Sequence, residues 1–147
     1  MKFPFVKTLI STLAVLLFSV AAMGASDIVV IVNEKNPAAT ITASQLEDYF
    51  MKRSRQWPNG DTIRFFDQRD ENESRKIFLK KFVNKTSRED ELYWIGEKIY
   101  TGNIAPIQIT SDSMMTSRVS RFPGGIGYVS SKFKLPKTVK RLEIKKD

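Results

Sequence analysis

The stretch Asp27-Ile-Val-Val-Ile-Val-Asn33 decides the class of fold that the sequence predicts. Its five central residues are all apolar and β-branched, and Asn36-Pro37 closes the run. A short, continuous apolar run of this kind is typical of a strand that is buried on both faces, as strands are inside a parallel or mixed sheet. We therefore expect a central sheet that carries helices.

Helix and strand signals alternate along the rest of the chain. Thr42 forms a predicted capping box with Gln45, and a second capping box, Thr86 with Glu89, opens a helix that Gly102 ends. The predicted helices cover 42–53, 71–84, 86–101 and 111–122, and the predicted strands cover 27–33, 62–66, 107–109, 126–129 and 139–144. This order indicates an α/β domain in which about four helices flank a central mixed sheet.

Residues 1–25 have the pattern of an export signal. Lys2 and Lys7 precede an apolar run of about 14 residues, and small residues follow the run. The run is shorter than the ~20 residues that a membrane-spanning helix needs. We therefore expect a cleaved Sec-type signal peptide at 1–25, with an uncleaved anchor as the alternative, and one domain at 26–147.

The composition excludes several kinds of chemistry. The chain has 147 residues with no Cys and no His, which excludes disulfides, a thiol nucleophile, a lipid-modified Cys, a Ser-His-Asp triad and a His-based zinc site. Because no nucleophile motif is present either, we expect no enzyme activity, no metal and no cofactor. The net charge is +8, and basic residues crowd the tail from Lys132 to Lys146. No nucleic-acid-binding motif accompanies them, so we expect a solvated surface and no specific nucleic acid.

Two stretches resemble a known family. They are Ile41-Thr-Ala-Ser-Gln-Leu-Glu-Asp-Tyr-Phe-Met-Lys-Arg-Ser-Arg-Gln-Trp-Pro-Asn-Gly60 and Phe122-Pro-Gly-Gly-Ile-Gly-Tyr-Val129. Together they are similar to the phosphate-binding protein of the phosphate ABC transporter, in the type 2 periplasmic binding protein superfamily. The resemblance spans nearly the whole predicted domain but only about one lobe of that two-lobed protein. It implies the fold of one lobe, a periplasmic location and a solute-binding role.

The resemblance also implies a set of ligand-binding residues. The family's lobe offers an Arg, then Ser-Gly-Thr at a helix N-terminus, then a Phe. Arg69 and Phe78 match the Arg and the Phe, and counting back from Phe78 puts the triplet on Asn72-Glu73-Ser74. Arg69, Asn72 and Ser74, with Arg75 beside them, are therefore the expected oxyanion ligands, because an Arg fork, hydroxyls and a helix start all favour an anion.

The same segment departs from the family's pattern. Asp70, Glu71 and Glu73 would repel phosphate, and one like-charge pair at 4 Å costs ~4 kcal/mol at an effective dielectric of 20. A capped helix start with solvated charges is therefore an alternative interpretation, and Ca²⁺ binding by the carboxylates is another. The second lobe, which would cover the ligand, is missing from the match, so we expect weak affinity unless a homodimer or a partner completes the cleft.

Two further segments are candidates for anion binding. Gly124 and Gly125 could cradle a phosphate with backbone N–H groups, or could simply form a Gly-rich turn between a helix and a strand. The helix start at 111–113 could bind an anion, or could only be capped by its own side chains.

Two functions follow from these patterns. The leading hypothesis is a periplasmic solute-binding module that binds phosphate or another small oxyanion for an ABC transporter permease or a sensor. The alternative is a non-catalytic interaction or scaffold protein of the cell envelope that keeps the fold without the ligand.

Overall fold

A computed structural model describes residues 27–147. The predicted signal peptide, residues 1–25, lies outside the described residues. Within residues 27–147, no helix is long and apolar enough to cross a membrane.

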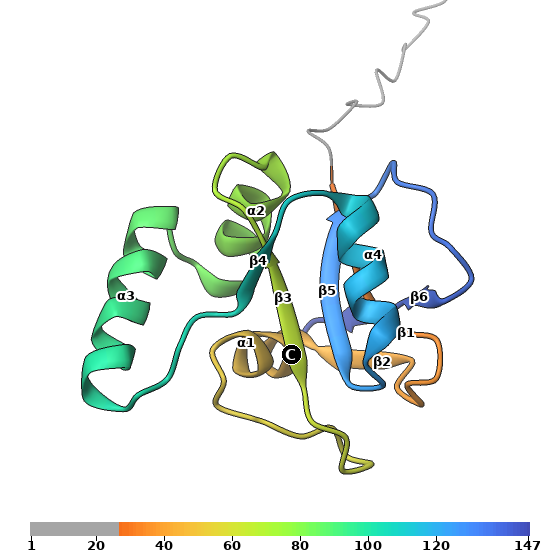
Figure 1. Cartoon of the computed structure of the whole chain (residues 1–147), viewed down its shortest axis with the longest axis horizontal. Coiled ribbons are helices and arrows are strands. Elements are labelled where there is room, and N and C mark those ends of the chain that lie inside the picture. Colours follow the sequence, from red (N-terminus) through yellow and green to blue (C-terminus); the bar gives the residue numbers. More distant parts are fainter. Residues whose placement is uncertain (1–26) are drawn as a thin grey trace, which may run out of the picture.

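A five-stranded mixed sheet forms the centre of the fold, in the order β4-β3-β5-β1-β6 (Figure 1). Strands β3, β4 and β5 are parallel to one another, and β1 runs antiparallel to both β5 and β6. A separate pair, β2 with β7, is parallel. The strands are β1 (Ile28–Asn33), β2 (Thr40–Thr42), β3 (Arg64–Gln68), β4 (Ile107–Ile109), β5 (Gly125–Ser130), β6 (Val139–Arg141) and β7 (Glu143–Lys145).

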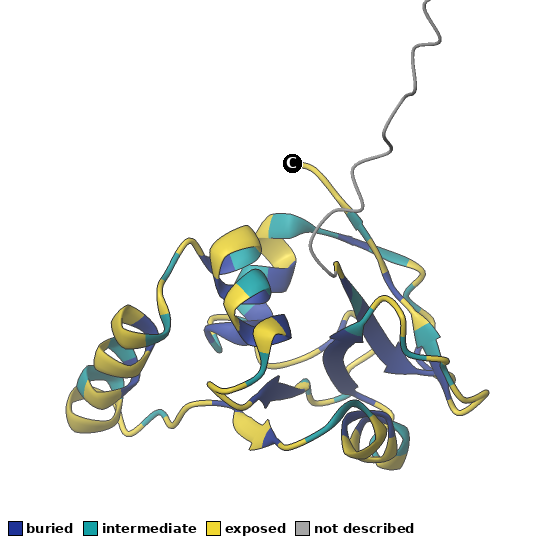
Figure 2. Cartoon of the chain, turned by 90° about the horizontal axis from the view of Figure 1, so that it is seen from above, coloured by how far each residue is buried: buried dark blue, intermediate teal, exposed yellow. Residues whose placement is uncertain are grey.

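Helices cover both faces of this sheet, as the apolar run at 28–32 predicts. Helix α4 (Asp112–Arg121) packs on one face, and α1 (Ala43–Phe50), α2 (Glu73–Phe78) and the π-helical turn η1 (Leu79–Val83) lie on the other (Figures 1 and 2). Strand β1 alternates between the two sides, because Val30 and Val32 join the core beneath α1 and α2 whereas Ile31 joins the core beneath α4. The sheet therefore separates two hydrophobic clusters.

The predicted helix starts are confirmed. Thr42 with Gln45 and Thr86 with Glu89 both form complete capping boxes, and Gly102 takes a positive φ just beyond helix α3 (Ser87–Tyr100). The predicted helix 71–84 is instead α2 followed by η1, and it ends at Asn84, whose φ of 52° is left-handed.

Two predictions about the strands need correction. The predicted strand 139–144 is two strands, because Leu142 turns inward between β6 and β7 and each strand pairs with a different sheet. The predicted strand 62–66 begins later, at Arg64, and continues to Gln68, so Asp67 and Gln68 are buried strand residues.

Helix α3 is the element whose observed burial differs most from the burial that its apolar pattern predicts. Among its residues only Asp90 and Trp94 are buried, whereas Ile99 is 72% and Tyr100 87% exposed. Figures 1 and 2 show α3 standing at one side, apart from the sheet and the other helices. Of its apolar side chains, Trp94 joins the core cluster beside Phe50 and Tyr93 packs against that cluster, whereas the others contribute little.

Candidate anion-binding site

The carboxyl ends of the three parallel strands meet at one edge of the sheet. The backbone N–H of Arg69, just after β3, donates to the carbonyl of Ile109 at the end of β4 over 3.3 Å. Ligands of open α/β sheets bind beyond this edge. The segment 69–74, which the resemblance implies as the ligand-binding stretch, thus lies where an α/β fold places a site.

Asn72 and Ser74 form the turn into α2. The Asn72 side-chain oxygen accepts from the Ser74 backbone N–H over 3.0 Å, and its amide nitrogen donates to Gln68 Oε1 over 3.0 Å. Asn72 is therefore the helix cap and holds the turn against β3. Arg69 is exposed, and within residues 27–147 its guanidinium makes no ion pair. Of the predicted ligands, Arg69 is thus the cation that is open to solvent.

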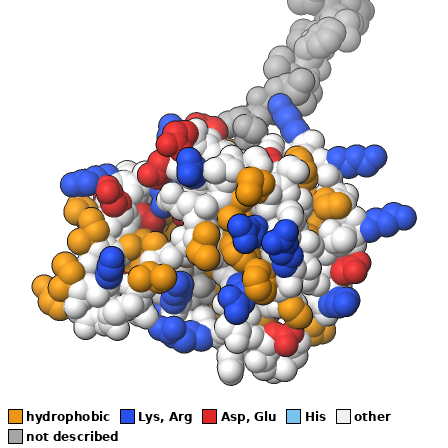
Figure 3. All heavy atoms as spheres, viewed as in Figure 1, with side chains coloured by type: hydrophobic (Ala, Val, Ile, Leu, Met, Phe, Trp, Pro, Cys, Tyr) orange, Lys and Arg blue, Asp and Glu red, His pale blue; other side chains and the backbone are white. Residues whose placement is uncertain are grey.

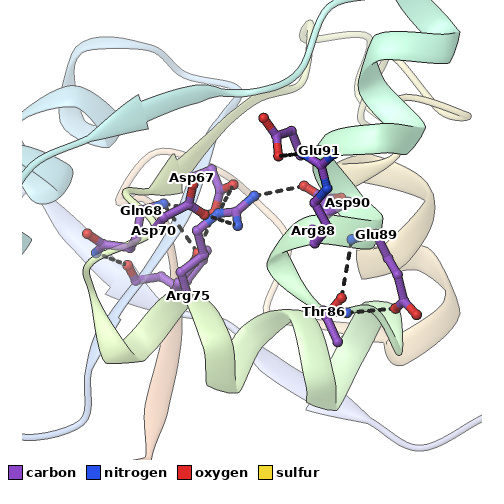
Figure 4. Close-up of polar contacts among 10 residues, drawn as sticks. Asp67, Gln68, Asp70, Arg75, Thr86, Arg88, Glu89, Asp90 and Glu91 are labelled. Atoms are coloured by element: carbon purple, nitrogen blue, oxygen red, sulfur yellow. Dashed lines mark hydrogen bonds and ion pairs between the residues drawn. The ribbon is translucent and has the colours of Figure 1, made fainter.

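Arg75 has a different environment. Its guanidinium forms ion pairs with Asp67 (2.9 Å), Asp70 (2.5 Å) and Asp90 (2.7 Å), and its side chain is only 4% exposed. Figure 4 shows the Arg75 side chain reaching from α2 toward Asp90 on α3. The three carboxylates already pair with the positive charge that an oxyanion would need. Arg75 therefore links α3 to the end of β3.

Burial and charge together set the ionisation of this cluster. The pKa of Asp90 is raised to about 6, chiefly by burial and also by the nearby Asp67 carboxylate, against the opposing effect of the Arg75 guanidinium. Burial also raises the pKa of Asp67, against the opposing effects of Arg75 and of the Tyr128 hydroxyl, which donates a hydrogen bond to it. The ion pairs of this cluster therefore form at a cost in free energy, because the buried charged groups lose their contact with water.

An aspartate occupies the neighbouring helix start. Asp112, the first residue of α4, accepts from Gln68 Nε2 over 3.0 Å and from the Ser130 backbone N–H over 3.2 Å. The Ser111 hydroxyl caps the same helix. Because a carboxylate already takes these donors, this helix start repels a second anion, and the predicted capping role accounts for its residues.

The structure does not bring Gly124 and Gly125 to Arg69. Gly125 pairs with Arg64 at the beginning of β3, and at a rise of about 3.3 Å per residue the strand separates the glycines from Arg69 by roughly 15 Å. Close packing explains both glycines. A Cβ at Gly124 would lie 1.9 Å from the Thr62 carbonyl oxygen, and one at Gly125 would lie 2.6 Å from that of Val119.

Comparison with known proteins identifies solved structures that share this fold. No family model and no curated protein matches the sequence. Among solved structures, an ABC-type phosphate transport receptor from Vibrio cholerae superposes with a TM-score of 0.64 at 19% identity, over 81% of this chain and 46% of that one. This chain has the fold of one lobe of a periplasmic-binding-protein-like protein.

Two other solved structures agree with this fold. PstS from Borrelia burgdorferi matches with a TM-score of 0.62 at 17% identity, over 81% of this chain and 47% of that one. A substrate-binding protein from Clostridium perfringens, solved with bound phosphate, matches with a TM-score of 0.60 at 18% identity, over 81% of this chain and 45% of that one. The single-lobe chain therefore spans less than half the length of each.

Asp90 and Gln68, which the sequence did not single out, complete this edge together with Asp112 of the predicted helix start. Asp90 and Asp112 hold Arg75 and Gln68 in place, and the buried Gln68 links Asp112 to Asn72. The sequence contained a signal for the burial of Asp90, because this acidic residue lies one helical turn before Trp94 on the buried side of α3. Nothing in the local sequence marks Gln68, whose partners are brought by the pairing of strands.

Proposed function

We propose that this chain is a periplasmic solute-binding module that binds a small oxyanion, phosphate first among them, at the carboxyl edge of its sheet. The observation that carries the proposal is Arg69, a solvent-exposed cation without an ion pair in the described residues, at the edge where α/β folds bind ligands. The likeness of the fold to phosphate transport receptors supports phosphate as the anion.

The residues of the segment have separate roles in this proposal. The Arg69 guanidinium contacts the anion as a bidentate fork, and the Ser74 hydroxyl donates to it. Asn72 positions both by holding the turn against Gln68. Arg75 acts through Asp70, whose carboxylate it draws toward itself over 2.5 Å. This pairing lowers the repulsion that Asp70 would exert on phosphate.

The protein delivers its ligand to a partner in this proposal. The solved structures of similar fold include a phosphate transport receptor, so an ABC transporter permease or a sensor of the envelope is the proposed recipient. The same likeness supports a non-catalytic role. Neither the structure nor the comparisons support the homodimer that the sequence leaves open.

Isothermal titration calorimetry with inorganic phosphate at low salt tests this proposal. We expect weak, saturable binding by the purified protein, because residues 27–147 form one lobe and leave the anion open to solvent, and loss of that binding in Arg69→Ala. Arg88→Ala is the matched control, since Arg88 is an exposed arginine that pairs with Glu91 on α3, away from the turn. Equal phosphate affinity in the wild type and in Arg69→Ala would refute the assignment of Arg69.

The buried side chain of Arg75 favours a second candidate function. Because Arg75 is enclosed by three carboxylates and Asp112 occupies the next helix start, the lobe can also be a scaffold that keeps the fold and binds proteins. Absence of heat at millimolar phosphate, in a protein whose circular dichroism shows it to be folded, would favour this second function.

A further inference from the structure

Exposed apolar side chains are concentrated in one part of the molecule. Seven large hydrophobic residues are exposed in the described part of the chain, and six of them lie between residues 92 and 107. Figure 3 shows hydrophobic side chains gathered over α3 and the segment that leads from it toward β4. The six are Leu92, Ile95, Ile99, Tyr100, Ile104 and Ile107. Such a concentration marks an interaction site more often than a solvated surface.

A groove of about 500 Å³ separates α3 from the edge of the sheet. Trp94 and Ile95 of α3 line one side, and Ile104, Ala105 and Gln108 line the other. The Arg75 cluster lies at its floor, where Arg75, Asp70 and Asp90 all contribute to the lining. Ser87, Glu91 and Lys98 of α3 also line the groove, so its sides carry both apolar and polar side chains.

The strand beside the groove is an open edge. Strand β4 pairs with β3 on one side, and no strand in the described residues pairs with its other side. Its three residues carry no charge, and Ile107 is 64% exposed. Natural edge strands are usually protected by charged side chains, bulges or a covering element. Here α3 stands beside the edge with the groove between them.

We propose that this groove binds an extended segment of a partner protein, which pairs with β4 as a sixth strand and places alternate apolar side chains against α3. An extended main chain offers the row of N–H and C=O partners that the open edge of β4 lacks, and its alternate side chains can pack on Ile95 and Ile104, which line the groove. The inference does not depend on anion binding, because Arg69 does not line the groove.

Selection of random phage-displayed peptides on the purified protein tests this proposal. We expect enriched peptides with alternating apolar residues, bound with an affinity measured by fluorescence anisotropy. Hydrogen exchange of the backbone amides in 107–109 should slow when such a peptide is added. Ile95→Lys and Ile104→Lys should each weaken binding by at least about tenfold, because both side chains line the groove and a charge there opposes burial.

Met114→Lys is the matched control. Met114 is also apolar and exposed, at 46%, but it lies on α4 and does not line the groove, so this variant should bind like the wild type. The proposal is overturned if no peptide is enriched, if Ile104→Lys binds the peptides as the wild type does, or if the bound peptides are helical by circular dichroism. Self-association that Ile104→Lys abolishes, without peptide binding, would assign the groove to a second copy and also overturn it.

Discussion

At the scale of single residues, Arg75 is the side chain on which the end of β3 most depends. Its replacement by Met would leave Asp67 and Asp90 buried without a counter-charge. Removal of one partner from a buried ion pair costs about 3–5 kcal/mol. We expect Arg75→Met to lower the free energy of unfolding by about this amount, as measured by urea denaturation.

The control for this prediction is another arginine. Arg88 is exposed and pairs with Glu91 at 2.8 Å, and exposed pairs contribute only about 0–1 kcal/mol. Arg88→Met should therefore leave the midpoint of unfolding nearly unchanged. Similar losses in the two variants would show that the buried cluster does not stabilise the fold more than a surface pair does.

Asp90 makes stability depend on pH. Its pKa is about 6 in the folded protein against the ordinary 3.8, so near pH 5 the folded state binds a proton that the unfolded state has lost. The free energy of unfolding therefore falls as pH rises from about 4 to 6, and the Asp90 contribution to this fall is roughly 2–3 kcal/mol. Burial of Asp67 acts in the same direction.

Asp90→Asn isolates this contribution. Urea denaturation at several pH values between 4 and 7 should show a shallower pH dependence in the variant than in the wild type. Part of the slope should remain, because the pKa of Asp67 is raised as well. Parallel curves for the two proteins would contradict the assignment of the raised pKa to Asp90.

At the scale of elements, the turn from α4 into β5 depends on the absence of side chains. The Gly124 carbonyl accepts from Trp57 Nε1 and from the Arg64 backbone N–H, at 3.1 and 3.0 Å. A Cβ at Gly124 would clash with the backbone of Thr62. We expect Gly124→Ala to lower the free energy of unfolding by about 1–3 kcal/mol, as overpacking does, and thermal denaturation measures it.

Helix α3 supplies the matched glycine. A Cβ at Gly96 would meet nothing within 4 Å, and replacement of glycine by alanine inside a helix stabilises it by about 0.5–1 kcal/mol. Gly96→Ala should therefore raise the melting temperature while Gly124→Ala lowers it. A shift of both variants in the same direction would be evidence against the packing that is described for β5.

At the scale of the whole molecule, the sheet joins two clusters that contact different helices. Trp57 and Trp94 both lie in the cluster beneath α1 and α2, whereas Met115 lies fully buried in the cluster beneath α4. Because β1 and β5 contribute to both clusters, we expect one cooperative unit. Met115→Ala should lower the free energy of unfolding by about 2–5 kcal/mol. It should also lower the midpoint of unfolding that tryptophan fluorescence reports, although neither tryptophan lies in the same cluster as Met115.

Two probes check this expectation. Urea unfolding followed by tryptophan fluorescence reports the first cluster, and far-ultraviolet circular dichroism reports the helices on both faces. The two transitions of Met115→Ala should coincide at a single, lower midpoint. Separate midpoints, with fluorescence unchanged from the wild type, would mean that the two sides of the sheet unfold independently.

Local chemistry made much of the fold predictable from sequence. Thr42 and Thr86 cap their helices through partners three residues away, so each box is visible in a window of four residues. The run 28–32 is β-branched throughout, and residues that alternate in a strand meet opposite faces. These features determined the α/β class, most element positions and the burial of β1, and the two motif stretches indicated a single lobe.

Only the tertiary structure decided which structural roles the charged residues and the glycines have. Arg75 is enclosed because β3 and α3 bring it Asp67 and Asp90, which lie 8 and 15 residues away along the chain. Gly124 and Gly125 are far from Arg69 because β5 lies parallel to β3 and pairs with its beginning. The apolar pattern of α3 does not reveal that this helix reaches the core through Trp94 and leaves most of its other apolar side chains exposed. Sequence patterns report interactions within a few residues, whereas strand pairing and helix docking depend on contacts between distant segments, and those contacts determine which charges are buried and which surfaces stay open.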